Sequence, residues 1–353
     1  MHDVAADFLC HLPTPLQPLP WRGLPLDGKL LLFERNTGLN ALLEGEETAH
    51  LHRLAPRTLL VAVTNACNLK CPFCYRPPEA RSLWRYDSLM TFCEEAAAWG
   101  VLEVAFGGGE PMLFPRWGEF ICELYERTPL AINFTTNGTL LTEPFLKQIA
   151  GRYGQIRLSL YEDNAWAETV ALLVRCGARF GVNWLITPAA LRTIEKTFAQ
   201  LLSLGVRDVL FLSYKGNEFP EMHLSPDEAR RFAAFLQRAH TALGGAVQLK
   251  LDVCWGESLA GVPSLFGTGD CAAADDFLSI TSDRQVKPCS FHEVAVPFET
   301  IDDLQSYWQA QRAARLPAPL GGCARLPQRG LGEKGGVSHA IIPLAAIQQQ
   351  PQR

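Results

Sequence analysis

The chain has 353 residues, of which 48% are hydrophobic and 20% are charged, as is typical of a globular protein with a large core. The formal net charge is −5 and no long basic run occurs, so charge gives no reason to expect nucleic acid or an anionic membrane as a partner. The N-terminus lacks the basic region and apolar stretch of a secretory signal, and no apolar run approaches the ~20 residues that span a bilayer. We therefore expect a cytoplasmic protein without a membrane-spanning segment.

Residues 1–56 are rich in Leu and Pro and precede a regular strand–helix pattern. Within them, residues 28–45 carry apolar segments on both sides of Asn36-Thr37-Gly38, a sequence that favours a turn. We expect an N-terminal segment over 1–56 that contains a β-hairpin.

A strand–helix alternation begins at Arg57, and the segments between its strands have helical spacing of apolar residues. The strands are nearly continuous in apolar residues, which favours a parallel sheet covered by helices. Six strand–helix units are too few for the closed eight-unit barrel, so the sequence predicts an α/β fold with a partial (β/α)6 barrel over residues 57–245. The predicted strands are 58–64, 101–106, 130–136, 155–161, 180–187 and 208–214.

The pattern changes after residue 245. Residues 248–254 are typical of one more strand, and residues 277–291 resemble a hairpin around Ser282-Asp283-Arg284. We expect a small C-terminal region over 246–325, followed by a loose tail over 326–353, where Gly, Gln and Pro accumulate.

The chain has eleven cysteines, and in a reducing cytoplasm clustered cysteines indicate metal binding or catalysis. Cys67, Cys71 and Cys74 lie together in CNLKCPFCY, directly after the first predicted strand. One loop could therefore supply three thiolates to an iron–sulfur cluster and leave the fourth iron open for a substrate or cofactor. The alternative is a structural zinc knuckle, but that site would need a fourth Cys or His close by, and His50 and His52 come before the strand.

This motif, with an aromatic residue after its last Cys, resembles the signature of the radical S-adenosylmethionine (SAM) superfamily. The resemblance implies a [4Fe–4S] cluster on Cys67, Cys71 and Cys74 that binds and reduces SAM. Cleavage would give methionine and a 5′-deoxyadenosyl radical, which abstracts a hydrogen atom from the substrate. An external electron donor such as flavodoxin or ferredoxin is implied as well. The protein would position substrate and cofactor and exclude water.

The second predicted strand is followed by GGGEP, residues 107–111. Glycine lets a backbone approach a ligand closely, and a carboxylate can accept a hydrogen bond from an ammonium group. In the family that this segment resembles, a Gly-Gly-Glu stretch binds the amino group of SAM. The resemblance therefore implies a SAM-binding role for Gly108, Gly109 and Glu110.

Polar residues at the ends of later strands extend the expected SAM site. Thr136 and Asn137 resemble the family's Thr-Asn-Gly turn, and Ser159 resembles the Ser of its Ser-x-Asp-Gly stretch, although Tyr161 replaces the Asp. Asn183 is a further candidate because α/β sheets place their ligands at the carboxyl ends of strands. The alternative for each of these residues is an ordinary buried or capping role.

The resemblance extends to Cys271 and Cys289, whose spacing is similar to that of the auxiliary-cluster region in the SPASM/twitch subgroup. The subgroup has Gly at the position of Arg284, so we expect a different type of hairpin turn here. Cys323 is the candidate third ligand of one auxiliary cluster, and Cys254 or an open iron site would complete it. The alternative is a structural region with ordinary thiols.

Enzymes of this subgroup mostly modify ribosomally made peptides or oxidise sugar-like or nucleotide-like small molecules. We favour an oxidoreductase or maturase that acts on a peptide or protein, since the N-terminal hairpin could offer a strand edge to a peptide. A small-molecule radical dehydrogenase is the second interpretation. A non-catalytic iron–sulfur electron carrier is an alternative of another class, and it is disfavoured because a carrier needs no SAM pocket.

Overall fold

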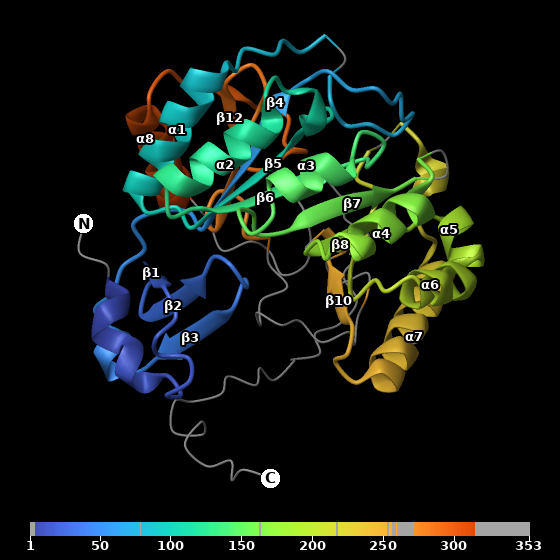
Figure 1. Ribbon diagram of the computed structural model, residues 1–353, viewed down its shortest axis with the longest axis horizontal. Coiled ribbons are helices and arrows are strands. Elements are labelled where there is room, and N and C mark those ends of the chain that lie inside the picture. The colour runs from blue at the N-terminus through green and yellow to red at the C-terminus, as the bar shows by residue number, and fades with distance from the viewer. Residues whose placement is uncertain are drawn as a thin grey trace.

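The computed structural model describes residues 4–77, 79–161, 164–216, 218–252, 254–255, 259 and 271–314. These residues form one ten-stranded sheet and one three-stranded sheet (Figure 1). The strand order of the large sheet is β10-β9-β8-β7-β6-β5-β4-β11-β12-β13, and hydrogen bonds between described strands leave it open at β10 and β13. The α/β fold expected from the sequence is confirmed, as a mostly parallel sheet whose described strands do not close into a barrel.

Every strand expected between residues 57 and 214 is present, and the seventh strand expected after residue 245 is β10. Neighbouring strands from β4 to β10 are all parallel, as the nearly continuous apolar segments predicted. These strands are β4 (Thr58–Thr64), β5 (Glu103–Gly108), β6 (Ala131–Thr136), β7 (Ile156–Leu160), β8 (Phe180–Leu185), β9 (Asp208–Leu212) and β10 (Gln248–Leu251).

Amphipathic helices cover one face of this sheet. On α1 (Tyr86–Trp99) the predicted apolar face is confirmed, because Leu89, Phe92 and Cys93 are all buried. The predicted capping box of α7 is confirmed too: the Glu228 carboxylate accepts a hydrogen bond from the Ser225 N–H at 2.9 Å. The other helices are α2 (Trp117–Arg127), α3 (Glu143–Gln148), α4 (Trp166–Arg175), α5 (Pro188–Arg192), α6 (Ile194–Ser203), α7 (Pro226–Leu243) and α8 (Ile301–Ala314), with 3-10 turns η3 (Pro111–Leu113) and η4 (Pro220–Met222).

The two faces of each parallel strand have different chemistry. In β4 the side chains of Leu59, Val61 and Val63 are buried in the core beneath the helices. The alternate positions point to the opposite, inner face of the curved sheet. By the same alternation Arg157 of β7 and Asp208 of β9 lie on the inner face, so that face is partly polar.

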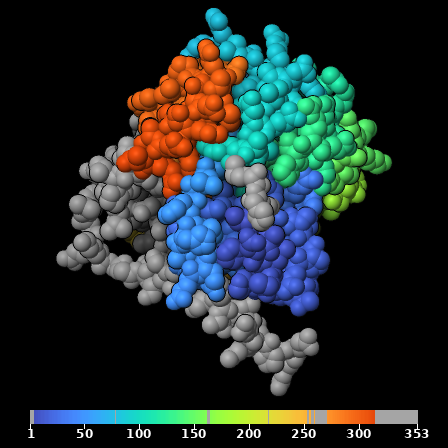
Figure 2. Space-filling model, turned by 90° about the vertical axis from the view of Figure 1, so that its left-hand side faces the viewer, coloured from blue at the N-terminus to red at the C-terminus, as the bar shows by residue number. Residues whose placement is uncertain are grey.

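The C-terminal hairpin joins the large sheet at its β4 edge. Strand β11 (Phe277–Ile280) pairs in parallel with β4, and β12 (Gln285–Lys287) and β13 (Val296–Pro297) continue the sheet in antiparallel pairs. Figure 2 shows the segment 271–314 lying directly beside elements from the first half of the chain. The hairpin was predicted from the sequence, but its parallel pairing with β4 was not.

Arg284 lies in the turn of that hairpin with a φ of 59°, the left-handed conformation that glycine favours. The expected change of turn type is therefore wrong. The Arg284 guanidinium donates to the Glu299 carbonyl at 2.8 Å and lies over the Trp84 ring, 5.2 Å from its centroid. These contacts hold the side chain in place and offset the strain of the backbone.

The N-terminal segment forms its own small antiparallel sheet. The predicted hairpin is present as β2 and β3, and β1 adds a third strand that the sequence did not predict because Gly23 and Pro25 are unfavourable strand residues. The elements are η1 (Val4–His11), β1 (Trp21–Pro25), β2 (Lys29–Glu34), β3 (Asn40–Glu44) and η2 (Glu46–Thr48).

This small sheet packs against the amino ends of two parallel strands. Leu31 and Phe33 of β2 share a buried cluster with Leu102, just before β5, and with Ala131, the first residue of β6. Arg22 of β1 donates to the Val101 carbonyl at 2.9 Å. In Figure 1 the small sheet lies at the lower left, at the other end of the large sheet from the loop that follows β4.

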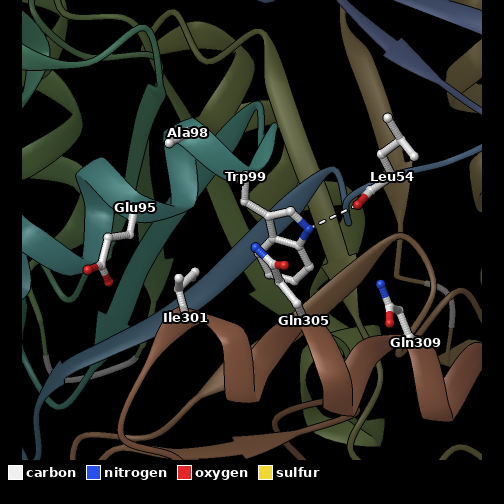
Figure 3. A pocket seen from close by; sticks show the side chains of 7 residues that line it. All are labelled: Leu54, Glu95, Ala98, Trp99, Ile301, Gln305 and Gln309. Atoms are coloured by element: carbon white, nitrogen blue, oxygen red, sulfur yellow. Dashed lines mark hydrogen bonds between the residues drawn. The ribbon is translucent and has the colours of Figure 1, made fainter. Parts of the chain in front are cut away.

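A shallow hollow of about 370 Å³ lies between α1 and α8 (Figure 3). The Trp99 indole N–H donates to the Leu54 carbonyl at 2.9 Å, and Gln305 and Gln309 approach from α8. Because α1 runs antiparallel to the strands, its last residue Trp99 lies at their amino ends. The hollow is therefore remote from the edge where parallel sheets bind ligands.

Candidate active site

Residues 65–85 connect β4 to α1 and cross the sheet at the carboxyl ends of its strands (Figure 1). We call them the cysteine loop. Within it Cys67 and Cys71 are half-buried and Cys74 is exposed, and the Cys74 N–H donates to the Cys71 carbonyl at 3.1 Å. The structure thus places all three predicted cluster ligands in one loop at the ligand-binding edge of the sheet.

The donor set of this loop, three cysteine thiols, has the chemistry of an iron–sulfur cluster site. In a cubane each thiolate ligates a different iron, so the three sulfur atoms need not converge on one point. Soft thiolates are also the ligands that iron–sulfur clusters prefer.

An asparagine inside the Cys motif fastens the loop to the end of β6. The Asn68 amide donates to Thr139 Oγ1 at 2.7 Å, and its Oδ1 accepts from the Asn137 amide at 2.9 Å. Asn137, a predicted SAM-site residue, is therefore a direct partner of the cysteine loop. Sequence reasoning missed Asn68, because a polar residue between two cysteines gives no signal of its own.

Gly108 and Gly109 allow the end of β5 to lie against the backbone of β4 and of the cysteine loop. Gly108 has a φ of 105°, and a Cβ at Gly109 would lie 1.9 Å from the Ala66 carbonyl oxygen. The N–H groups of Gly109 and Glu110 donate to the carbonyls of Thr64 and Ala66 at 2.7 and 2.8 Å. These two glycines thus permit a close approach between two segments of the chain, and not to a ligand.

Gly107 differs from its two neighbours. A Cβ built at Gly107 would meet no atom within 4 Å, so this position faces open space. By strand alternation it lies on the inner face, since Phe106 is buried on the helix-covered face. Of the three glycines, Gly107 is the one beside which a ligand could lie, although sequence reasoning had selected Gly108 and Gly109.

Glu110 is the centre of a buried hydrogen-bond network. Its side chain is 1% exposed, and it accepts hydrogen bonds from the Thr136 hydroxyl at 2.8 Å and from the Asn137 N–H at 2.8 Å. The Met112 N–H donates to the same carboxylate at 3.1 Å. The structure therefore brings together the predicted residues of the Gly-Gly-Glu and Thr-Asn-Gly segments.

All partners of the Glu110 carboxylate are neutral. Burial raises its pKa above the ordinary value, and the hydrogen bonds from Asn137, Thr136 and Met112 oppose that shift without cancelling it. One oxygen accepts two hydrogen bonds and the other accepts one, so a lone pair remains for a further donor. A cationic ligand group at this point would supply the charge that the protein does not.

Ser159 and Asn183 are direct neighbours across β7 and β8, as expected for two residues of one site. Asn164, which sequence reasoning missed, is 2% exposed and donates to the carbonyls of Ser159 and Asn137 at 2.6 and 2.7 Å. It ties the end of β7 to the turn after β6. The Asn183 Oδ1 accepts a hydrogen bond from the Arg157 guanidinium at 2.9 Å. Asn183 is therefore already bonded to a residue that lies nearer the amino ends of the strands.

Tyr161 occupies the position where the family that this sequence resembles has Asp. It contacts the cysteine loop. Its ring lies 5.6 Å from that of Phe73. Burial raises the pKa of Tyr161 to about 12, with Ser159 opposing the shift and the nearby thiols of Cys71 and Cys74 adding to it. The phenol is therefore neutral at physiological pH and contributes a hydrogen-bonding hydroxyl where Asp would contribute a charge.

Two of the segments that carry predicted auxiliary ligands lie near one another. The Ala274 N–H donates to the Pro288 carbonyl at 3.2 Å, which brings the segments of Cys271 and Cys289 side by side. The Cys254 N–H donates to Asp252 at 2.9 Å. Cys323, the third predicted ligand, lies outside the described residues.

Aromatic and ionic contacts link the Asp252 end of this region to the cysteine loop. Asp252 pairs with Lys215 at 2.5 Å, and Lys215 Nζ lies 4.8 Å from the centroid of the Phe291 ring. Phe291, two residues after Cys289, has its ring 4.7 Å from that of Tyr75, the residue after Cys74. A continuous set of contacts therefore joins both cysteine-bearing regions.

A second polar cluster lies on the inner face toward the amino ends of the strands. Asp208 pairs with Arg157 at 2.6 Å and with Lys250 at 2.6 Å. Burial alone would raise the pKa of Asp208, but the two cations outweigh burial and hold it below the ordinary value. Unlike Glu110, this carboxylate is neutralised by the protein.

Residues 61–212 match the family model described as Radical SAM superfamily. Over these residues the chain is similar to the radical SAM superfamily. The match begins in β4 and ends with β9, so it includes the cysteine loop, the Glu110 network and the Ser159–Asn183 pair. Among the described residues, none of the helices combines the length and apolar character that a membrane crossing requires.

Two curated relatives are similar to part of the chain. PqqA peptide cyclase of Gluconobacter oxydans is 39% identical over 97 residues, which is 27% of this chain and 27% of that protein. The tungsten-containing aldehyde ferredoxin oxidoreductase cofactor-modifying protein of Pyrococcus furiosus is 33% identical over 96 residues, 26% of this chain and 27% of the relative. The chain thus aligns with only about a quarter of the length of either relative.

Solved structures with the same fold cover more of the chain. Streptococcus suis SuiB bound to precursor peptide SuiA has a TM-score of 0.60 at 18% identity over 72% of this chain and 65% of that one. Native anSMEcpe with bound AdoMet has a TM-score of 0.54 at 20% identity over 68% of this chain and 76% of that one. These likenesses show that the fold extends beyond the segment that the family model matches.

Proposed function

We propose that this protein is a radical SAM oxidoreductase or maturase that acts on a peptide or protein in the cytoplasm. The observation that carries the proposal is the joining of the cysteine loop to the Glu110 network by Asn68 and Ala66 at the carboxyl ends of the strands. A [4Fe–4S] cluster held by Cys67, Cys71 and Cys74 would supply the electron that cleaves SAM to methionine and a 5′-deoxyadenosyl radical.

The chain's own residues would bind and orient SAM beside that cluster. Glu110 would accept a hydrogen bond from the SAM ammonium with its remaining lone pair, and Gly107 would leave room for the ligand on the inner face. Thr136 and Asn137 would fix the Glu110 carboxylate. Ser159 and Asn183, together with the hydroxyl of Tyr161, would line the next strands along the same edge.

A peptide substrate is supported by the N-terminal sheet. Strand β3 pairs with β2 on one side only, and no described strand pairs with its other side. An extended peptide can add to such an edge through main-chain hydrogen bonds. PqqA peptide cyclase and SuiB bound to precursor peptide SuiA, proteins similar to this chain, are peptide-directed by their names, which agrees with this substrate class.

SAM cleavage tests the proposal directly. Anaerobically reconstituted protein, given SAM and dithionite, should form 5′-deoxyadenosine, and replacing Cys67, Cys71 and Cys74 together by Ala should abolish the product. A matched Cys10→Ala/Cys176→Ala variant, which removes two thiols outside the site, should retain it. If the triple variant still cleaves SAM, the assignment of the site is wrong.

We further propose one auxiliary cluster on Cys271, Cys289 and Cys323, with Cys254 or an open iron site completing it. Fully reconstituted protein should then contain about eight irons per chain for two cubanes, against about four for one. A Cys271→Ala/Cys289→Ala variant should fall to the lower figure and still cleave SAM. A wild-type value of four would remove these cysteines from the site.

A further inference from the structure

The cysteine loop has a charge opposite to that of the rest of the chain. Between Asn65 and Arg85 it carries four basic side chains and one acidic one, a net charge of +3, so the other residues carry −8 of the chain's total of −5. Lys70, Arg81 and Arg85 are all exposed. A local field of this sign on an acidic protein attracts an acidic partner.

Three of these basic side chains form no ion pair with the residues that the structure describes. On nearby helices, Arg116 pairs with Glu119 and Arg127 pairs with Glu123. Within the part of the chain that the structure describes, no carboxylate lies within ion-pair distance of Lys70, Arg81 or Arg85. The loop therefore presents its positive charge to solvent.

Apolar side chains are exposed in the same loop. The Tyr75 and Leu83 side chains are 53% and 47% exposed, which is high for large apolar or aromatic groups. Main-chain contacts hold the second half of the loop in place, since the Leu83 N–H donates to the Ser282 carbonyl at 2.8 Å. Apolar residues with a charged rim are typical of protein–protein contact surfaces.

We propose that the exposed face of the cysteine loop is the docking surface for an acidic one-electron donor protein, an inference that rests on the proposed function. The donor must deliver an electron to a cluster held by this same loop, and Cys74 is exposed there. A partner seated on Tyr75, Leu83 and the basic residues would contact the same loop that holds the cluster, beginning at the residue next to Cys74. Such redox encounters bury little area and depend strongly on charge.

Charge reversal tests this surface. Arg81→Glu/Arg85→Glu should raise by about tenfold or more the concentration of reduced flavodoxin, an acidic donor, that gives half-maximal SAM cleavage. The rate with dithionite, a small reductant that needs no docking, should stay unchanged. The matched control is Arg192→Glu/Arg231→Glu, two exposed arginines on α5 and α7 whose reversal changes the total charge by the same amount. The control should leave the flavodoxin requirement within about twofold of wild type.

A direct measurement of flavodoxin binding distinguishes failure of the docking surface from failure of the proposed function. Oxidised flavodoxin should bind wild type with an affinity that falls as salt rises, and the Arg81/Arg85 variant should bind it more weakly even if SAM cleavage were absent. Equal effects in both variants, an unchanged flavodoxin requirement or a parallel fall in the dithionite rate would overturn the docking surface. A change in peptide turnover alone would assign the surface to the substrate instead and would also overturn it.

Discussion

Two buried carboxylates at opposite ends of the same parallel sheet are stabilised in opposite ways. Asp208, toward the amino ends, has Arg157 and Lys250 as partners and a lowered pKa. Glu110, at the carboxyl ends, has only neutral hydrogen-bond donors and a raised pKa. A charge that the protein neutralises belongs to the scaffold, whereas a charge that it leaves without a counter-ion marks a place for a cationic ligand.

The largest effect on stability should follow from removing Asp208. Asp208→Ala leaves Arg157 largely buried without its carboxylate, and breaking such a pair costs about 3–5 kcal/mol of unfolding free energy. SAM cleavage by the surviving folded protein should keep its dependence on SAM. Glu195→Ala is the control, because the exposed Glu195–Arg238 pair should contribute less than about 1 kcal/mol. Denaturant titration measures both, and equal costs would contradict the comparison.

Glu110→Gln should have its main effect on SAM. Loss of the carboxylate would leave the SAM ammonium without its partner, at a cost of about 2–5 kcal/mol, so the SAM concentration needed for cleavage should rise roughly 30-fold or more. Iron content should stay unchanged. Thr136→Val is the control: it removes the hydrogen bond to Glu110 and the one from the Gly138 N–H, each worth about 1 kcal/mol, but keeps the charge. If Glu110→Gln has the SAM dependence of wild type, Glu110 belongs to the scaffold like Asp208.

The two carboxylates should also respond to pH with opposite sign. Asp208 has a lowered pKa in the fold, so its contribution to stability is complete above about pH 4 and is lost as pH falls through the folded value. Glu110 has a raised pKa, so the fold gains stability as pH falls from that value toward about 4. The unfolding free energy of the wild-type apo-protein minus that of Asp208→Ala should decrease as pH falls through the folded pKa of Asp208. The unfolding free energy of wild type minus that of Glu110→Gln should instead increase as pH falls toward about 4. Parallel curves would show that the two environments are alike.

The smallest effect concerns Arg284, a cation whose partners are a carbonyl and two aromatic rings. Arg284→Gly relieves a left-handed backbone worth about 1 kcal/mol but loses the contacts to Trp84, Phe298 and Glu299, so the stability should change by less than about 1 kcal/mol. Arg284→Ala loses the same contacts and keeps the strain, so it should be less stable than the Gly variant. The reverse order would show that the turn is not strained.

Local patterns in the sequence were enough to predict much of this molecule. The strands from β4 to β9, the cysteine loop and the segments of Glu110 and Thr136 could be recognised because each consists of neighbouring residues with a fixed spacing. The chemistry of the Cys motif was equally local.

Features that depend on pairing between distant segments could not be predicted. Asn68 and Asn164 act through partners 69 and 27 residues away, and nothing in their own surroundings marks them. The choice of Gly107 over Gly108 depends on which face of β5 each glycine occupies. The Arg284 turn keeps its left-handed backbone because of Trp84, which lies on a segment far away in the sequence.

The position of the N-terminal sheet would set a minimum spacer length in a peptide substrate. The sheet packs at the amino ends of β5 and β6, while the cysteine loop lies at the carboxyl ends. A strand of β4's seven residues rises about 23 Å, and an extended peptide spans about 3.3–3.6 Å per residue. A substrate held at the edge of β3 would therefore need at least about seven residues between its recognition segment and the residue that is modified. Precursors with a shorter spacer should bind without being turned over.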